Sequence, residues 1–349
     1  MTSYPRNAWY VAAMHDELPA GSLLARTFLD DPVVLFRDAS GAPRALQDRC
    51  PHRFAPLSAG SLCDGGNSVQ CRYHGLQFQG DGPCSHNPHG PIPKAATVRA
   101  YPVRECARLV WIWMGDPALA DDSRIPDYSA VTTAHEDATI RGHLPTACEA
   151  MLLVDNILDL SHVDYLHPTS LGGGGLHHVK PVVADPAPDQ MKISWLSSGE
   201  TAPPALAMHL RDPAAPTDQW TEVTWTAPTT MLLSVGATLV GEPREDGFVA
   251  LNLHLATPET TGRTHYWYWS SRNCAIDPQA NAMIRSVVEN VFRNEDKPML
   301  EAQQQRMGTA GLWDLNPVLL AHDAGAVRCR RKLEAICRTE QAEFILELP

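Results

Sequence analysis

Apolar and polar residues follow two different patterns along the chain. Up to about residue 116, short runs rich in β-branched and aromatic residues alternate with turn-forming residues, as in Val-Val-Leu-Phe at residues 33–36 and Leu-Val-Trp-Ile-Trp at residues 109–113. Such runs are typical of β-strands joined by tight turns. The first third of the chain is therefore predicted to be all-β.

The remainder of the chain mixes helical and strand-like patterns. Residues 148–167 carry apolar side chains at helical spacing, and Pro168 stands just beyond them as a stop. Further helices are expected over residues 278–306 and 324–338, and strands over residues 231–239, 248–255 and 265–269. Strands combined with a few long helices predict an α+β domain in which helices cover a curved antiparallel sheet.

These patterns divide the chain into three expected parts. Residues 1–116 form the all-β domain, residues 117–147 form a linker and the start of the second domain, and residues 148–349 form the rest of that domain. The linker is indicated by Gly-Asp-Pro at residues 115–117 and by further Asp and Pro residues up to residue 127. A chain of 349 residues is long enough for two such domains.

Charge and composition narrow the range of functions. A formal net charge of -12 without a basic block argues against a nucleic-acid or anionic-membrane partner. No apolar run approaches the ~20 residues that cross a bilayer. Residues 1–10 lack the apolar segment of a signal peptide, so a cytoplasmic location is expected. The nine cysteines, an odd number, do not indicate a disulfide framework.

Two cysteines combine with two histidines in a pattern typical of a metal centre. Cys-Pro-His at residues 50–52 and Cys-Arg-Tyr-His at residues 71–74 are each expected on a hairpin-like loop. In a [2Fe–2S] cluster with mixed ligands, Cys50 and Cys71 would hold one iron and His52 and His74 the other. A tetrahedral zinc site is the first alternative, although mixed zinc sites more often pair C-x-x-C with H-x-x-x-H. A chance grouping on surface loops is the second.

A second set of polar residues lies within the helical pattern at residues 148–167. Asp155, Asp159 and His162 are spaced i, i+4 and i+7, so on one helix they share a face. Polar groups on a face flanked by apolar residues indicate ligands, and a hydrogen bond from the ring of His162 would satisfy the Asp159 carboxylate. The alternative is that these side chains make ordinary hydrogen bonds.

His162 and His167 could bind one ion only if the helix distorts or ends between them. Five residues correspond to about 140° around an ideal helix, so the two rings do not stack. A facial iron site also needs one carboxylate besides two histidines. By local chemistry, Glu295 and Asp296 are equally eligible.

With these motifs the chain resembles a known family, the Rieske non-haem iron aromatic oxygenases. It is most similar to the branch that holds the oxygenase components of vanillate O-demethylase, toluenesulfonate methyl-monooxygenase and dicamba O-demethylase. The similarity begins at residues 6–12, includes residues 50–58, 73–76 and 111–117, and continues through residues 155–167 to the acidic pair at residues 295–296. The order and separation of the two metal motifs match the family.

The resemblance implies a role for each candidate residue. The cluster ligands would be Cys50, His52, Cys71 and His74, and the ligands of a mononuclear non-haem Fe(II) would be His162, His167 and Asp296. Asp159 would bridge the cluster of one subunit to the iron of its neighbour in a head-to-tail homotrimer, and Asn156 is a further candidate catalytic residue. The loop from Cys63 to Ser68 is slightly longer than in near relatives, which bears on the surface where a reductase docks.

The implied activity is that of the oxygenase component of a multicomponent monooxygenase. It would use O2 and electrons from an NAD(P)H-dependent reductase, with or without a ferredoxin, to hydroxylate or O-demethylate a small, acidic aromatic substrate. The alternative is a Rieske electron-transfer protein with a non-catalytic binding domain, against which the second metal motif argues.

The same resemblance bears on the substrate. His254 falls where dicamba O-demethylase has a histidine that contacts its substrate, so His254 is expected near the acid group; a histidine packed in the core is the alternative. Leu233 and Val287 replace a pocket asparagine and tryptophan. Because they offer no hydrogen-bond donor, we expect poor binding of dicamba and a preference for a less halogenated methoxy- or methyl-aromatic acid.

Overall fold

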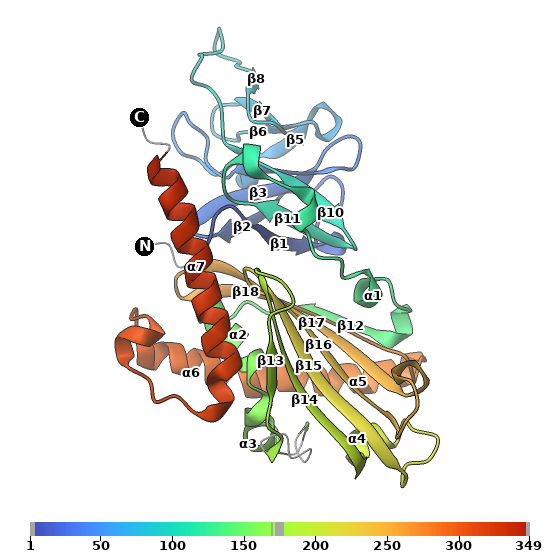
Figure 1. Ribbon diagram of the computed structural model, residues 1–349. Coiled ribbons are helices and arrows are strands. Elements are labelled where there is room, and N and C mark those ends of the chain that lie inside the picture. Colours follow the sequence, from blue (N-terminus) through green and yellow to red (C-terminus); the bar gives the residue numbers. More distant parts are fainter. Residues whose placement is uncertain (1–3, 169, 172–177, 347–349) are drawn as a thin grey trace. The chain divides into compact units, whose positions relative to one another are not determined.

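The computed structural model describes residues 4–168, 170–171 and 178–346 (Figure 1). The chain separates into two compact units, Thr2–Asp127 and Tyr128–Pro349. The domain limits expected at residues 116 and 147 stay predictions. Within the described residues, no helix combines the length and the apolar character that a membrane span requires.

The first unit is all-β, which confirms the prediction, and its strands form three small antiparallel sheets. In spatial order the sheets are β1 (Trp9–Met14), β11 (Leu109–Trp113) and β10 (Val103–Cys106); β2 (Leu24–Phe28), β3 (Asp31–Arg37), β4 (Pro43–Gln47) and β9 (Ala100–Tyr101); and β5 (Ser61–Cys63), β6 (Ser68–Gln70), β7 (Gln77–Gln79) and β8 (Cys84–His86). The loop over residues 63–68 is a 3₁₀ turn, η3 (Asp64–Gly66), between β5 and β6. That this loop is longer than in related proteins stays a prediction.

The most apolar strand of this unit lies in the middle of its sheet. All five residues of β11 are buried, and β1 and β10 pair with its two edges. The rings of Trp9 and Trp113 pack edge to face at 5.5 Å between centroids. A continuous apolar run is typical of a strand that is buried on both faces.

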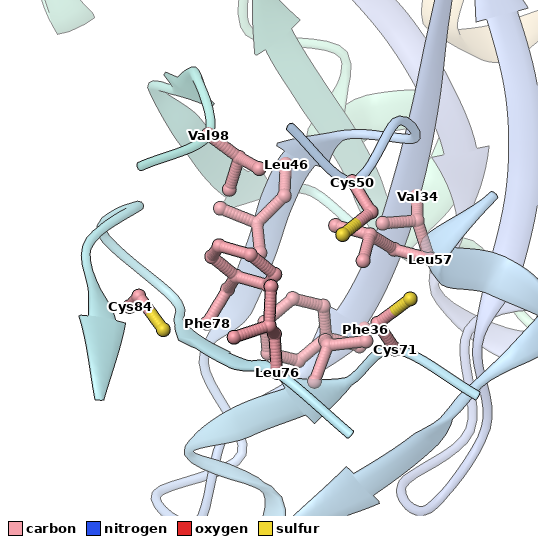
Figure 2. Packing of buried hydrophobic residues seen from close by; sticks show 11 residues of the cluster. Val34, Phe36, Leu46, Cys50, Leu57, Cys71, Leu76, Phe78, Cys84 and Val98 are labelled. Carbon is pink, nitrogen blue, oxygen red and sulfur yellow. The ribbon is translucent and has the colours of Figure 1, made fainter. Parts of the chain in front are cut away.

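The two cysteines of the predicted cluster motif belong to the core of the first unit. Figure 2 shows them at one end of a buried cluster, with Cys84 at the other end. The cluster consists of Val34, Phe36, Leu46, Cys50, Leu57, Val69, Cys71, Leu76, Phe78, Cys84 and Val98. The apolar core therefore anchors both motif loops at their cysteines.

The second unit is built on a seven-stranded antiparallel sheet, which confirms the α+β prediction. In spatial order its strands are β12 (Thr139–His143), β18 (Arg263–Arg272), β17 (Phe248–Thr260), β16 (Thr230–Leu239), β15 (Pro216–Thr226), β14 (Gln190–Thr201) and β13 (Val182–Ala184). Its helices are α1 (Ser129–Thr132), α2 (Ala150–Leu158), α3 (Val163–Leu166), α4 (Pro204–Ala207), α5 (Pro278–Asn290), α6 (Lys297–Met307) and α7 (Ala324–Leu346). Helices α2, α5 and α7 pack on this sheet (Figure 1).

The prediction of a single helix over residues 148–167 is wrong. Helix α2 ends at Leu158, and Asp159 is extended, with φ -127° and ψ 93°. The Asp159 carboxylate accepts a hydrogen bond from the Ser161 N–H at 2.9 Å and so caps a new 3₁₀ turn, η7 (Leu160–His162), which leads into α3. Aspartate favours caps over helix interiors because its side chain competes for backbone N–H groups.

Gly236 tests how tightly the large sheet is packed. It lies opposite Trp220 on the neighbouring strand, and a Cβ at this position would overlap the Trp220 ring and the Phe248 carbonyl. We expect Gly236→Ala to lower the free energy of unfolding by about 1–3 kcal/mol through overpacking. Gly262→Ala is the control, because nothing lies within 4 Å of its Cβ position. Equal urea-unfolding midpoints for the two variants would contradict the packing.

Candidate metal centres

The two Cys/His motifs of the first unit lie on loops with the same backbone hydrogen-bond pattern. In each loop the N–H of the cysteine, Cys50 or Cys71, donates to the carbonyl five residues later, and the N–H four residues later donates back to the cysteine carbonyl, all at 2.8–2.9 Å. The residue at that fourth position has a positive φ, 60° for Phe54 and 76° for Gly75. The two loops therefore share one backbone hydrogen-bond pattern around the cysteine, although the histidine follows two residues after Cys50 and three after Cys71.

The ligand types are separated by burial. Cys50 and Cys71 are buried, whereas His52 and His74 are partly exposed, with 4.5 Å between their ring centroids. Burial raises the pKa of the Cys50 thiol, and the adjacent Cys71 raises it further. A pocket of about 460 Å³ lies beside the two imidazoles. The four candidate ligands therefore fall into two pairs, two adjacent sulfurs in the core and two adjacent imidazoles near the surface.

This donor set fits a cluster with two metal ions better than a single zinc. Among the described residues, only a set in the second unit brings three His, Cys, Asp or Glu ligand atoms within 4.8 Å of one another. A tetrahedral zinc with bonds of about 2.0–2.3 Å would hold all four donors within such a distance. Two thiolates on one iron and two imidazoles on the other need no such convergence.

The second unit brings His162, His167 and Asp296 together. Their ligand atoms all lie within 4.8 Å of one another. The Asp296 Oδ1 atom is 3.1 Å from the His167 Nε2 atom and 3.7 Å from the His162 Nε2 atom. Two imidazoles and one carboxylate with free positions opposite them are the donor set of non-haem Fe(II) oxygenases. The residues present therefore fit a mononuclear iron.

Both histidines are held in the tautomer that a metal at Nε2 requires. The His162 Nδ1–H donates to the Asp159 carbonyl at 2.7 Å, and the His167 Nδ1–H donates to the Glu295 Oε2 atom at 2.6 Å. Burial alone would lower the pKa of His167, but its hydrogen bonds with Asp296 and Glu295 raise it. With Nδ1 occupied, the Nε2 atom of each ring is left to bind a metal.

Local chemistry left Glu295 and Asp296 as equal candidates for the carboxylate ligand. In the structure the two carboxylates contact different ring nitrogens of His167. Glu295 binds the Nδ1 side of His167 and also accepts from the Ser170 hydroxyl at 2.7 Å, whereas Asp296 faces the Nε2 side. Both lie in a π-helical turn, Val291–Asp296, between α5 and α6. Such turns are frequent at functional sites. Helical periodicity predicted one regular helix here and could not reveal the turn.

Asn156 lies beside the same ligand set, while Asp159 contributes differently from the prediction. The Asn156 Nδ2 atom is 3.3 Å from Asp296 Oδ1 and 3.4 Å from His162 Nε2. The expected bond between the Asp159 carboxylate and the His162 ring is wrong: the ring bonds to the Asp159 carbonyl, and the carboxylate caps Ser161. Asp159, Asn156 and His162 all line a pocket of about 290 Å³.

Asp155 lines the same pocket as Asp159 and His162 but does not belong to the ligand set. Its carboxylate forms a two-pronged ion pair with Arg330 of α7, at 2.6 Å to Nη2 and 2.9 Å to Nε. Arg330 also contacts Glu149 at 3.2 Å. Asp155, whose position suggested a metal ligand, instead forms an ion pair that links α2 to α7. Its partner is 175 residues away, so local sequence carried no signal of it.

His254 is buried in the sheet with one of its two ring nitrogens unpaired. Its Nδ1 atom lies 2.7 Å from the Tyr266 hydroxyl, and its Nε2 atom has no hydrogen-bond partner among the described residues. Burial lowers the pKa of His254 to about 4, although Asp296 acts in the opposite direction. The ring is therefore neutral at pH 7. It can hold an acid group by donating a hydrogen bond but not as a cation.

The Tyr266 hydroxyl determines which nitrogen of His254 carries the proton. If it donates to Nδ1, the proton lies on Nε2 and one donor is left unpaired. If Nδ1–H donated to the hydroxyl, both the phenolic proton and the Nε2 lone pair would lack partners. Burial raises the pKa of Tyr266, so the phenol keeps its proton. The first arrangement costs less, and it presents a free N–H at Nε2.

The two other residues of the substrate hypothesis occupy different environments. Leu233 lies on β16 and is half-buried, whereas Val287 of α5 is 41% exposed. Neither brings a polar group to the region of His254. The expectation of an apolar wall stays a prediction.

The neutral state of His254 predicts a specific pH dependence of stability. The unfolded chain binds this proton near pH 6.5 and the folded chain only near pH 4, so lowering the pH through this window favours unfolding. We expect this single proton to lower the free energy of unfolding by up to about 3 kcal/mol. In His254→Gln the loss of stability between these pH values should be smaller, as measured by urea unfolding. His86→Gln, at an exposed position, is the control; an unchanged pH profile for His254→Gln would contradict the assignment.

Comparisons with known proteins agree with the geometry of both centres. Residues 8–102 match the Rieske [2Fe-2S] domain, and residues 146–339 match the vanillate O-demethylase oxygenase C-terminal domain. The chain is 39% identical to the dicamba O-demethylase oxygenase component of Stenotrophomonas maltophilia, over 97% of this chain and 100% of the relative. It is also 39% identical to the chloroacetanilide N-alkylformylase oxygenase component of Rhizorhabdus wittichii, over 96% of each.

Comparison with solved structures indicates the same family. The crystal structure of dicamba monooxygenase with non-heme iron and dicamba superimposes with a TM-score of 0.83 at 37% identity, covering 97% of this chain and 98% of the other. The cofactors of this type of protein are a Rieske [2Fe–2S] cluster and a mononuclear non-haem iron. This chain therefore belongs to the Rieske non-haem iron oxygenases of the vanillate O-demethylase type, as the oxygenase component of a multicomponent monooxygenase.

Proposed function

We propose that this chain hydroxylates a methyl group or O-demethylates a methoxyl group of a small aromatic acid. The observation that carries the proposal is the convergence of His162, His167 and Asp296 in a chain that also has a Rieske domain. When bound, the cluster supplies single electrons and the mononuclear iron activates O2 at the positions that its three protein ligands leave open. O-demethylation would consume O2, two electrons and two protons and yield a phenol, formaldehyde and water.

In this proposal each residue of the two centres has a defined task. The cluster would be held by Cys50, His52, Cys71 and His74, and the mononuclear iron by His162, His167 and Asp296. Glu295 orients the ring of His167 from its Nδ1 side, and the Asp159 carbonyl does the same for His162. The Asn156 amide can donate to the carboxylate of Asp296 and so hold it in place.

The electrons would reach the iron from the cluster of a second copy, within a head-to-tail homotrimer. The path would lead from His74 of one copy through Asp159 to His162 of the next. Support comes from the pocket that Asp159 and His162 line, since its lining includes apolar side chains that are unusually exposed, such as Val318 at 87% and Leu319 at 50%. Beside His74, Tyr73 is also 65% exposed. Exposed apolar groups at two complementary places are typical of a protein interface.

An oxygenase component takes its electrons from a separate protein. We propose an NAD(P)H-dependent reductase, acting directly or through a ferredoxin. Its docking surface would include His52, which is exposed and borders the pocket beside the two imidazoles. The cytoplasmic location expected from the sequence stays a prediction.

His254 is proposed as an anchor for the acid group of the substrate. Its Nε2–H is buried, unpaired within the described part of the chain and near enough to Asp296 to feel its charge. A ligand that accepts this hydrogen bond would remove the cost of a buried unpaired donor. Leu233 and Val287 favour a substrate with a more apolar ring than dicamba.

Removal of single ligands should separate the two metal centres. We expect Asp296→Ala and His162→Ala to lose the mononuclear iron and to keep the EPR signal of a reduced Rieske cluster, so that iron falls from about three to two atoms per chain. Asp159→Asn should keep both metals but slow electron transfer from cluster to iron, because its charge is lost. Asp246→Asn, a change on an exposed turn, is the control.

The outcomes that would contradict this proposal are distinct. A preparation without iron–sulfur absorbance after anaerobic purification would end the Rieske assignment. Normal single-turnover rates in Asp159→Asn would rule out the bridge while leaving the metal ligands in place.

Turnover of a panel of aromatic acids with a surrogate reductase tests the substrate class. The panel contains the three methoxybenzoates, vanillate, 4-toluenesulfonate and dicamba, with formaldehyde or alcohol as the product that is measured. His254→Ala should raise KM for the best acid by about 10-fold or more and affect its neutral methyl ester much less, since hydrogen bonds to charged groups are worth about 1.5–3 kcal/mol. A similar loss on both would remove the acid-anchor role. Efficient turnover of dicamba would contradict the pocket argument.

A further inference from the structure

Strand β17 carries a second polar side chain on the same face as His254. Asn252 precedes His254 by two residues, and the pairing of β17 with both neighbouring strands is regular over this stretch. Residues two apart on a strand, and residues directly opposite on paired strands, lie on the same face of a sheet. Leu233 of β16 and Ser270 of β18, which flank Asn252, therefore share the face of His254.

Asn252 and Ser270 are half-buried polar residues without partners. Within the residues that the structure describes, neither side chain has a hydrogen-bond partner, although both are only partly accessible to water. The Nε2 atom of His254 on the same face is fully buried and unpaired among the described residues. Buried polar groups are normally paired, so this atom indicates a ligand, and Asn252 and Ser270 offer the ligand further polar contacts beside it.

The helix that crosses this face sets the direction in which a ligand would lie. Helix α5 begins near Asn281, whose amide donates to the Thr139 carbonyl at 3.0 Å, and α6 begins at Lys297, which reaches the Pro145 carbonyl at 2.5 Å. The helix pair thus runs along β12 from its start to beyond its end. Asn252 lies level with the start of β12, and Asp296 lies towards its far end, with His254 between them.

We infer that Asn252 and Ser270, together with His254, form the acid-binding subsite of the substrate pocket and determine which aromatic acids are accepted. The inference rests on the proposed function and deepens it. The acid group would accept hydrogen bonds from the Asn252 amide, the Ser270 hydroxyl and the His254 Nε2–H. The methyl or methoxyl end would then point along β17 towards His162, His167 and Asp296.

This arrangement also explains the apolar residue at position 233. Leu233 and Asn252 are direct cross-strand neighbours, whose Cβ atoms are about 4.5–5.5 Å apart. The Asn252 amide is therefore the donor that this part of the face offers, and Leu233 leaves an apolar contact beside it. The acid group should sit between Asn252 and Ser270, and this placement decides which ring position faces the iron ligands.

Binding measurements without a reductase test this subsite directly. The probes are 2-, 3- and 4-methoxybenzoate and their methyl esters, titrated calorimetrically into the metal-loaded protein. We expect Asn252→Leu to raise Kd for the preferred acid about 10- to 100-fold, as for a lost hydrogen bond to a charged group, and Kd for its ester at most about fivefold. Ser270→Ala should act in the same direction but less. Ser271→Ala, on the same strand but the opposite face, should change neither.

The double variant Leu233→Asn/Asn252→Leu returns the amide to the neighbouring strand. It should recover acid binding to within about fivefold of the parent, because a donor is again present on the face. Its preferred methoxybenzoate isomer should change, because the acid group is shifted. Recovery also shows that loss of binding in Asn252→Leu is not caused by misfolding.

Three results would overturn the inference: unchanged acid affinity in Asn252→Leu, equal losses for acid and ester, or a parent that binds none of the three acids. None of these touches the proposed function, which is judged separately by the iron content of the ligand variants and by turnover of the wider panel. A protein that lacks the Rieske signal fails the proposed function whatever its affinity for acids.

Discussion

The end of helix α2 at Asp159 is the constraint on which the mononuclear centre depends, because an uninterrupted helix would turn His162 and His167 away from each other by about 140°. The Asp159 carboxylate binds the Ser161 N–H and starts a new turn, and the Asp159 carbonyl accepts the Nδ1–H of His162. Both imidazoles can then reach one carboxylate, that of Asp296. A single residue with a strong capping preference thus converts a helix face into a three-sided metal site.

The same residue connects the local geometry to the assembly that we propose. Its backbone carbonyl and one carboxylate oxygen are used within the turn, and its side chain also lines an open pocket beside His162. The negative charge is thus held rigidly at a place that a second subunit could reach. A bridging carboxylate whose position is fixed by the turn that orients the iron ligand would couple electron delivery to the geometry of the site.

The two kinds of site in this protein differ in how their polar groups are satisfied. Around the metals, atoms that do not bind metal hold the ligands in place: backbone bonds in the two cluster loops, and Glu295 and the Asp159 carbonyl at the histidines. Such outer partners set tautomer and orientation before the metal arrives. On the face proposed for the substrate, the Nε2 atom of His254 is buried without a partner among the described residues. The metal sites are therefore preorganised, whereas the substrate face leaves donors open for a ligand.

The sequence by itself determined the motif pairs, the all-β start and the main strands, though not the helix over residues 148–167, because the first three depend on residues within a few positions of one another. It also narrowed the iron carboxylate to two adjacent residues. The family resemblance then pointed to Asp296, and the tertiary structure gives the physical reason: a π-helical turn places Glu295 and Asp296 on opposite sides of His167, so that Asp296 faces both histidines. The tertiary structure also pairs Asp155 with Arg330 and places Asn252 opposite Leu233. Ion pairs between distant segments, like the register of paired strands, form only when the sheet and its helices pack.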